Sequence, residues 1–159
     1  TCGGLCPLGG VDKTFLRRWL VAAEKESVSQ CQAIKALKFV NEQEPTAELR
    51  PADQEQKDEE DLMPYEVLDF IEKASIRDKK SPQSIFAEVQ ETYDVSGEKA
   101  YQWIEKFFRL WSRNQWKRER YAPAFHMDDE NLDPKTWCRF PILSGSYKRE
   151  LARIKASFS

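Results

Sequence analysis

The sequence predicts a mostly α-helical domain, and three observations lead to this prediction. Apolar residues recur three and four positions apart in several segments, which is the spacing of one face of an α-helix. No segment alternates apolar and polar residues clearly enough to predict a strand. Hydrophobic residues make up 40% and aromatic residues 12% of the 159 positions, which is enough for the core of one globular domain and excludes a wholly disordered chain.

The first forty residues are expected to form a loop followed by two helical segments. Residues 1–10 are rich in Gly and Pro and are predicted to be loop. Asp12 stands where an N-cap residue belongs, and an apolar helical face follows it. A weaker apolar stripe extends from Ile34 to Val40. The face that follows Asp12 consists of Phe15, Leu16, Trp19, Ala22 and Ala23.

Four more helices are predicted in the rest of the chain. Pro64 can open the first, and Ser81 followed by Pro82 is an N-cap signal for the second. Ser96 caps the third, which has the strongest apolar stripe, and Tyr147–Phe158 is a short basic amphipathic helix. The apolar residues of the first three are Tyr65, Val67, Leu68, Ile71; Ile85, Phe86, Val89, Tyr93; Ala100, Trp103, Ile104, Phe107 and Trp111.

Two further stretches are expected to be irregular. Residues 118–146 contain three prolines, which discourage a continuous helix. Residues 42–63 contain two prolines and then, between Asp53 and Asp61, six acidic residues and one lysine without any apolar residue to bury. Such a run is expected to be an exposed, mobile loop; it could hold a divalent cation, but acidic loops are more often only solvated.

Bulk composition excludes several classes of protein. The formal net charge of −2 favours no particular partner. No apolar run approaches the roughly 18 residues that span a bilayer, so no membrane association is expected. Four cysteines are too sparse for a disulfide framework, which favours a reducing, cytoplasmic compartment. The chain starts with Thr1 rather than Met, which is typical of a processed chain or of a piece of a longer one.

Candidate catalytic and metal-binding groups are few. Cys2 and Cys6 have C-x3-C spacing, but no second pair follows at a metal-ligand spacing, so no metal site is expected. His126 is the only histidine and has no nucleophile or partner nearby in the sequence. We therefore expect no catalytic residue within the chain.

Lys13 is the first candidate for binding an anion. The segment Gly9–Thr14 has the residue types of the end of a P-loop, but two residues separate the last Gly from the Lys, so the P-loop pattern does not match. Lys13 nevertheless lies in the first turn of a helix entered from a glycine loop, where backbone N–H groups and the helix dipole favour an anion. On these residues alone, however, a solvated first-turn lysine is the favoured interpretation.

The segment Lys99–Arg120 combines seven basic residues with aromatic residues. This combination allows a stand-alone helical module that binds nucleic acid or an acidic protein. The helical spacing of the aromatic residues is more typical of a core, so nucleic-acid binding is not the favoured interpretation. The residues Trp116–Arg120 lie beyond that stripe, and a phosphate-bearing ligand would suit them.

Four sequence elements, taken together, resemble the C-terminal part of a NAD synthetase. They are Pro7-Leu-Gly-Gly-Val-Asp-Lys13, Glu44-Pro-Thr-Ala-Glu-Leu-Arg-Pro51, Asp58-Glu-Glu-Asp-Leu-Met-Pro-Tyr65 and Asn114-Gln-Trp-Lys-Arg-Glu-Arg-Tyr-Ala-Pro-Ala-Phe-His126. The Pro-Ala-Phe-His end of the last element resembles the glutamine-dependent form. The resemblance covers about Thr1 to His126. For residues 143–159 the sequence predicts a capping helix and indicates no function.

The resemblance implies an activity and a fold. Family members use ATP to adenylate the nicotinate carboxylate of deamido-NAD, and ammonia, taken from glutamine, then attacks the acyl-adenylate. The family fold is a doubly wound parallel α/β sheet with a nucleotide crevice. The chain would be the helical C-terminal portion of that domain, and family members form homodimers, so a homo-oligomer is expected.

The resemblance also implies site residues. Lys13 and Thr46 match positions that bind ATP, and the pair Trp116 and Lys117 matches a His-Lys pair that contacts deamido-NAD. Residues 48–61 correspond to a mobile loop that closes over the nucleotides. Gly4 lies in the opening stretch where an acidic contact to the dinucleotide is usual.

This sequence departs from the family in three respects. Trp116 stands where the family has His, so that position is limited to indole donation or stacking. Glycines replace the Ala-Asp of the opening stretch. The pyrophosphate-binding S-G-G-x-D-S loop and the glutaminase domain are absent from the 159 residues. The ligands of Mg²⁺ are therefore expected outside this chain, and the fragment by itself is expected to be inactive; a degenerate domain kept for assembly is a third possibility.

Overall fold

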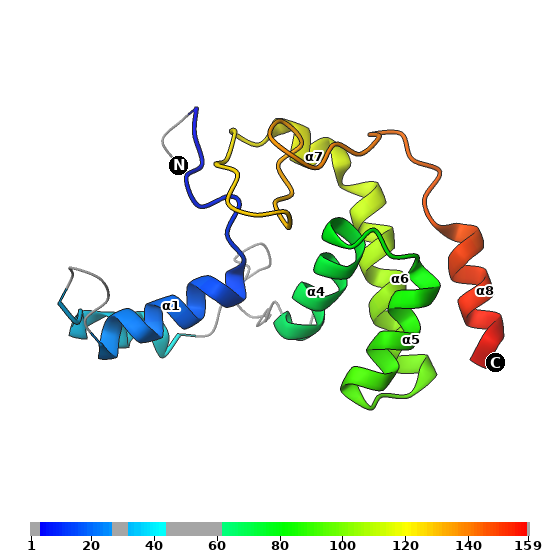
Figure 1. Cartoon of the computed structure of the whole chain (residues 1–159), viewed down its shortest axis with the longest axis horizontal. Helices are drawn as coiled ribbons and strands as arrows, with labels where there is room; N and C mark the ends of the chain where they lie inside the picture. Colours follow the sequence, from blue (N-terminus) through cyan, green and yellow to red (C-terminus); the bar gives the residue numbers. More distant parts are fainter. Residues whose placement is uncertain (1–3, 27–31, 44–61, 159) are drawn as a thin grey trace, which may run out of the picture. The chain divides into compact units, whose positions relative to one another are not determined.

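The computed structural model describes residues 4–26, 32–43 and 62–158, which form helices joined by loops (Figure 1). No strand is present in these ranges, so the prediction of a mostly helical chain is confirmed. The chain divides into two compact units, residues 1–10 with 67–159 and residues 11–66. Thr46 and the predicted mobile loop 48–61 lie outside the described residues.

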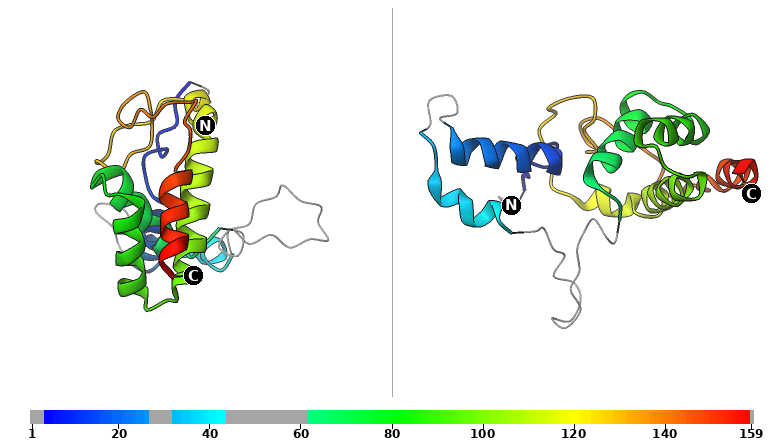
Figure 2. Two further views of the ribbon diagram at one scale, coloured as in Figure 1. Left: turned by 90° about the vertical axis from the view of Figure 1, so that its right-hand side faces the viewer. Right: turned by 90° about the horizontal axis from the view of Figure 1, so that it is seen from below.

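The first unit is built on three packed helices, α5 (Pro82–Tyr93), α6 (Gly97–Arg113) and α8 (Lys148–Phe158). Figure 2 shows the three lying side by side. The N-caps predicted for α5 and α6 are confirmed, because Ser81 Oγ accepts from the Ser84 N–H at 3.2 Å and Ser96 Oγ accepts from the Lys99 N–H at 3.3 Å. The buried core includes Ile85, Phe86, Val89, Ala100, Trp103, Ile104, Phe107, Phe108, Leu151 and Ile154.

Most of the aromatic stripe of α6 is therefore core, and its last member, Trp111, is half-buried. Trp103, Phe107 and Phe108 are at most 8% exposed, so they offer no stacking surface to a nucleic acid. The exposed aromatic residue of the basic segment is Trp116, which lies after α6. This arrangement removes the main support for the stand-alone nucleic-acid-binding module.

Helix α4 (Tyr65–Glu72) begins directly after Pro64, as predicted, and continues into a π-helical turn, η2 (Lys73–Arg77). Two residues after this turn, Lys79 adopts a left-handed conformation with φ of 56°. The Lys80 N–H bonds back to the Ala74 carbonyl at 3.0 Å, so Lys79 occupies the position that usually closes a helix with Gly.

The irregular stretch starts later than predicted. Helix α7 (Gln115–Arg120) includes residues 118–120, which the prolines had suggested would be loop. Those prolines lie at 123, 134 and 141, after α7, so they do not interrupt it. Lys135 Nζ donates to the carbonyls of Glu119 and Tyr121 at 3.2 and 2.7 Å, which satisfies the C-terminal end of this short helix.

The second unit pairs helix α1 (Lys13–Lys25) with the short helices η1 (Lys35–Leu37) and α2 (Lys38–Asn41). The Ile34 N–H bonds to the Ala23 carbonyl at 2.8 Å. Asn41 Nδ2 donates to the Leu20 carbonyl at 3.2 Å and to Glu24 Oε2 at 2.8 Å. These bonds hold α1 against the segment that follows it.

The apolar face of α1 is largely uncovered. Phe15 is 53% exposed and Trp19 is 46% exposed, while Ala23 is buried. Periodicity predicted the helix correctly, but of the five residues on the predicted face this chain buries only Ala23. Asp12 is the N-cap residue by its extended backbone, but its side chain makes no capping hydrogen bond.

No helix in the described part of the chain is long and apolar enough to cross a membrane.

Candidate functional site: two clusters of basic and aromatic residues

The first cluster lies at the start of α1 within the second unit. Lys13 Nζ lies 5.0 Å from the centre of the Tyr65 ring, and the Arg17 guanidinium carbon lies 5.6 Å from the same centre. Both distances are those of cation–π contacts. Lys13 is exposed and Tyr65 is 7% exposed, so a buried ring supports two cations beside the N-terminal end of a 13-residue helix.

This cluster joins residues that lie about fifty positions apart in the sequence. Lys13 is the last residue of one of the four elements that resemble a NAD synthetase, and Tyr65 is the last residue of another. Their contact therefore brings the ends of these two elements together. Arg17 was not among the predicted site residues. Its spacing of four from Lys13 places both on one helix face, which was a signal in the sequence once the helix was assigned.

The second cluster lies on α7 in the first unit. The Trp116 ring is 47% exposed, with Lys117 Nζ at 5.8 Å and the Arg120 guanidinium carbon at 5.4 Å from its centre. An exposed indole between two cations can stack on a flat heterocycle while the cations attract a phosphate. Trp116, Lys117 and Arg120 therefore form one exposed cluster on α7.

Arg118 lies in the same helix, but its guanidinium group bonds to backbone carbonyls of the protein. Its Nε donates to the Leu132 carbonyl at 2.9 Å and its Nη2 donates to the Cys138 carbonyl at 2.7 Å. The guanidinium also bonds to Gln115 Oε1 and covers the Trp111 ring at 4.2 Å. Burial lowers the pKa of Arg118 from its ordinary value. These donors are used within the protein. Arg118 therefore holds the 121–147 segment against α7, and its donors are not available to a phosphate.

A pocket of about 340 Å³ adjoins α7. Arg118, Tyr121 and Asp133 line it together with Gly9. The N-terminal loop passes close by, since the Cys6 N–H bonds to the Pro123 carbonyl at 3.0 Å. The glycine-rich opening and the Pro-Ala-Phe-His element are therefore neighbours.

Gly10 is required by this close approach. A Cβ atom at Gly10 would lie 2.7 Å from the Phe125 carbonyl oxygen and 3.2 Å from Asn131 Nδ2. Gly4 has no such constraint, because a Cβ atom there would meet nothing within 4 Å and the residue is exposed. The structure thus gives a steric reason for Gly10 and none for Gly4.

A buried polar pair fixes the loop beside the pocket. Asp133 is 7% exposed and accepts from the N–H groups of Ala124 at 2.7 Å and Lys135 at 2.9 Å. Asn131 Oδ1 accepts from the Asp133 N–H at 2.8 Å, and its Nδ2 donates to the Phe125 carbonyl at 3.1 Å. Burial by itself would raise the pKa of Asp133, but these backbone donors and the Lys135 charge hold that pKa below its usual value.

Replacing Asp133 by Asn is expected to destabilise the chain by about 2 kcal/mol at neutral pH, since an amide presents one acceptor oxygen where two N–H groups need one each. The lowered pKa means that the carboxylate stabilises the fold fully above the unfolded-state pKa of about 4, and that this contribution disappears as the pH falls further. In urea titrations between pH 7 and pH 3, the free energy of unfolding should decrease less with falling pH in Asp133→Asn than in the native chain. Glu91→Gln, on the exposed side of α5, is the matched control, and equal stability of the two variants would refute the role of Asp133.

His126, Cys6 and Cys138 are among the described residues, whereas Cys2, the partner of Cys6 in the C-x3-C pair, and Cys31 lie outside them. His126 Nε2 lies 3.8 Å from Asp129 Oδ1, and its ring lies 4.9 Å from that of Trp137. Cys6 and Cys138 are free thiols. No group of three His, Cys, Asp or Glu side chains that could hold a metal ion occurs within the described ranges.

The comparisons with known proteins agree with one another. A family model for NAD synthase matches residues 5–121. The chain is 28% identical over 141 residues to the glutamine-dependent NAD(+) synthetase of Rattus norvegicus. The matched region covers 86% of this chain and 19% of that protein. It is 30% identical over 143 residues to the enzyme of the same name from Acinetobacter baylyi, and this match covers 90% of this chain and 23% of that protein.

A solved structure gives the same result. The crystal structure of a glutamine-dependent NAD(+) synthetase from Cytophaga hutchinsonii superposes with a TM-score of 0.73 and 40% sequence identity. The superposition covers 95% of this chain and 22% of that one. The chain therefore spans about a fifth of the length of the relatives it matches. Because the family model matches most of its residues, this chain belongs to the NAD synthase family.

Proposed function

We propose that this chain is the C-terminal part of a glutamine-dependent NAD synthetase, an ATP-dependent ligase that converts deamido-NAD to NAD. The observation that carries the proposal is the contact between Lys13 and Tyr65, which brings two of the elements that resemble the family together in one cluster of basic and aromatic residues. In the reaction, the nicotinate carboxylate attacks the α-phosphorus of ATP and releases pyrophosphate. Ammonia then attacks the acyl-adenylate and releases AMP.

Lys13 is proposed to bind ATP. An ammonium group near the phosphates offsets negative charge that grows as the adenylyl and pyrophosphate groups separate. The Tyr65 ring limits the positions of the lysine side chain, which reduces the entropy lost when it engages the nucleotide. Thr46 is proposed to add a hydroxyl donor to a phosphate oxygen, and closure of residues 48–61 would exclude water from the hydrolysis-prone adenylate.

Trp116 and Lys117 are proposed to bind deamido-NAD, with Gly4 in the segment that borders it. The indole would stack on a flat ring of the dinucleotide, and Lys117 would pair with its pyrophosphate. Since Trp replaces the family's His here, stacking takes the place of an imidazole hydrogen bond. Gly4 offers the ligand only backbone groups and open space.

The remainder of the parent enzyme is proposed to supply what this chain lacks. That remainder includes the parallel α/β core with the pyrophosphate loop, the ligands of Mg²⁺ and the glutaminase domain. We assign no Mg²⁺ ligand and no step through the metal to the described residues, among which no group of three His, Cys, Asp or Glu side chains is placed to hold a metal ion. We expect the fragment to be inactive by itself, the parent to be a cytoplasmic homo-oligomer, and the open apolar face of α1 to be covered in the parent.

The test of the dinucleotide site is Lys117→Ala in the full-length enzyme. Loss of one charge-assisted hydrogen bond should raise the KM for deamido-NAD about tenfold and leave the KM for ATP unchanged. Arg153→Ala, on the exposed surface of α8, is the matched control and should behave as the native enzyme. Native kinetics in Lys117→Ala would remove Lys117 from the site.

A further inference from the structure

A second pocket of about 340 Å³ lies in the first unit, away from the residues assigned above. The end of η2, the residues up to the start of α5 and the C-terminal half of α6 form one part of its wall, and residues 138–140 with Tyr147 form the other. The family model ends at residue 121, so the second part of the wall lies outside the family match. We call this cavity the C-terminal pocket.

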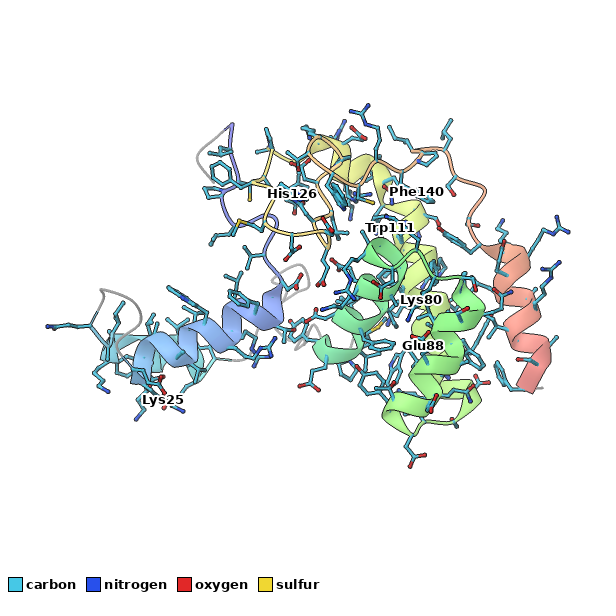
Figure 3. All side chains as sticks on the ribbon, viewed as in Figure 1. Lys25, Lys80, Glu88, Trp111, His126 and Phe140 are labelled. Atoms are coloured by element: carbon cyan, nitrogen blue, oxygen red, sulfur yellow. The ribbon has the colours of Figure 1, made fainter. Side chains whose placement is uncertain are left out.

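Aromatic rings provide the apolar part of the C-terminal pocket. The Phe108 and Tyr147 rings have centres 4.5 Å apart, and the Trp111 and Phe140 rings meet edge to face at 5.7 Å. Figure 3 labels Trp111 and Phe140 where the 138–147 segment passes α6. Four rings around a small cavity favour a flat apolar ligand, because such a ligand can stack on one ring and meet the edges of others.

Cationic side chains provide its polar part. Lys79, Lys80 and Arg139 line the pocket, and no acidic residue does. Lys80 Nζ pairs with Glu88 Oε2 at 2.7 Å, and Lys79 Nζ donates to the Ile76 carbonyl. Arg139 makes no side-chain hydrogen bond or ion pair within the described parts of the chain. The pocket therefore has one positive charge, that of Arg139, with which no described side chain pairs.

Two further features of the wall suit an anion. Ser81 and Pro82 begin the 12-residue helix α5, so the positive end of its dipole adjoins the pocket. Lys79 adopts a left-handed φ of 56°, a conformation that Gly would adopt without strain, and a lysine there keeps a cation at the rim. Burial raises the pKa of Tyr147, so its phenol is a neutral group near neutral pH.

We propose that the C-terminal pocket binds a small aromatic carboxylate, with its ring among Phe108, Trp111, Phe140 and Tyr147 and its carboxylate paired with Arg139. A guanidinium group with unused donors matches one carboxylate through two parallel N–H···O bonds. The volume lies at the lower end of the range for small-molecule sites, which suits a ligand with one or two rings. None of the residues proposed to contact ATP or deamido-NAD lines this pocket.

The experiment is a two-dimensional ¹H–¹⁵N NMR titration of the 159-residue chain with 1-naphthoate. The neutral 1-naphthamide serves as the charge control for the probe, and Trp111→Phe identifies the Trp111 indole signal among the five tryptophans. Saturable shifts of that indole and of the Cys138–Phe140 amides are expected with naphthoate. Arg139→Ala should weaken the affinity about tenfold, and naphthamide should bind the native chain about as weakly.

Arg153→Ala, an exposed arginine of α8 that does not line the pocket, is the matched control and should keep native affinity. If Arg139→Ala loses the dispersed spectrum of a folded chain, Arg139→Gln replaces it, because Gln keeps most of the stem and removes only the charge. Equal affinities of the native and Arg139 variants would overturn the proposal. Naphthoate shifts confined to α1 would also overturn it, since they would show binding to the open apolar face instead.

Discussion

Arg118→Ala is expected to lower the free energy of unfolding by about 3 kcal/mol, which is the largest stability loss predicted here for a single substitution in the first unit. The side chain holds the carbonyls of Leu132 and Cys138 and covers the Trp111 ring. Its removal leaves carbonyl oxygens without their donor and uncovers an indole. The 121–147 segment has no helix or strand of its own, so it depends on this anchor.

The measurement is urea unfolding combined with amide hydrogen exchange. Exchange should accelerate between 121 and 147 and remain slow in α5 and α6. Arg118→Lys keeps the charge but not the forked geometry, so it should recover only part of the lost stability. Arg113→Ala, at the exposed end of α6, is the control and should stay within about 0.5 kcal/mol of the native chain. An Arg118→Ala chain with native stability would show that the carbonyl contacts contribute nothing.

Lys13→Ala in the full-length enzyme is expected to lower kcat/KM for ATP about a hundredfold. The reason is the loss of the ammonium group that offsets charge on the separating phosphates. The Tyr65 ring positions that group, so Tyr65→Leu should cause a smaller loss, while Tyr65→Phe, which keeps the ring, should remain close to native.

Steady-state kinetics with ATP varied at saturating deamido-NAD provides the measurement. Lys25→Ala, at the opposite end of α1, is the control for general effects on that helix and should retain native kcat/KM (Figure 3). If Lys13→Ala and Lys25→Ala were equally active, the ATP assignment of Lys13 would be wrong. Equal losses in Tyr65→Phe and Tyr65→Leu would instead show that the ring is not what positions the lysine.

The helices could be predicted because their signals are local. Ser81 and Ser96 each bond to an N–H group three residues later, so the whole interaction lies within four residues of sequence. The same holds for the buried face of α6, whose Trp103 and Phe107 are one helical turn apart.

The site could be predicted only in part, because its remaining contacts are not local. Arg118 was grouped with Lys117 as a phosphate-binding residue, and the carbonyls that occupy it come from a segment without periodicity. The support of Lys13 by Tyr65 joins positions 52 residues apart, which no spacing rule reports. Phe15 and Trp19 were placed on the correct face, but whether a face is buried depends on what packs against it.

The most direct test of the account is to express the complete reading frame that contains these 159 residues and to measure NAD formation. With deamido-NAD, ATP and either glutamine or ammonia, the full-length protein should form NAD, AMP and pyrophosphate in equal amounts, and the 159-residue chain by itself should form none. A folded full-length protein that makes no NAD from either nitrogen source would contradict the assignment of this chain to a working NAD synthetase.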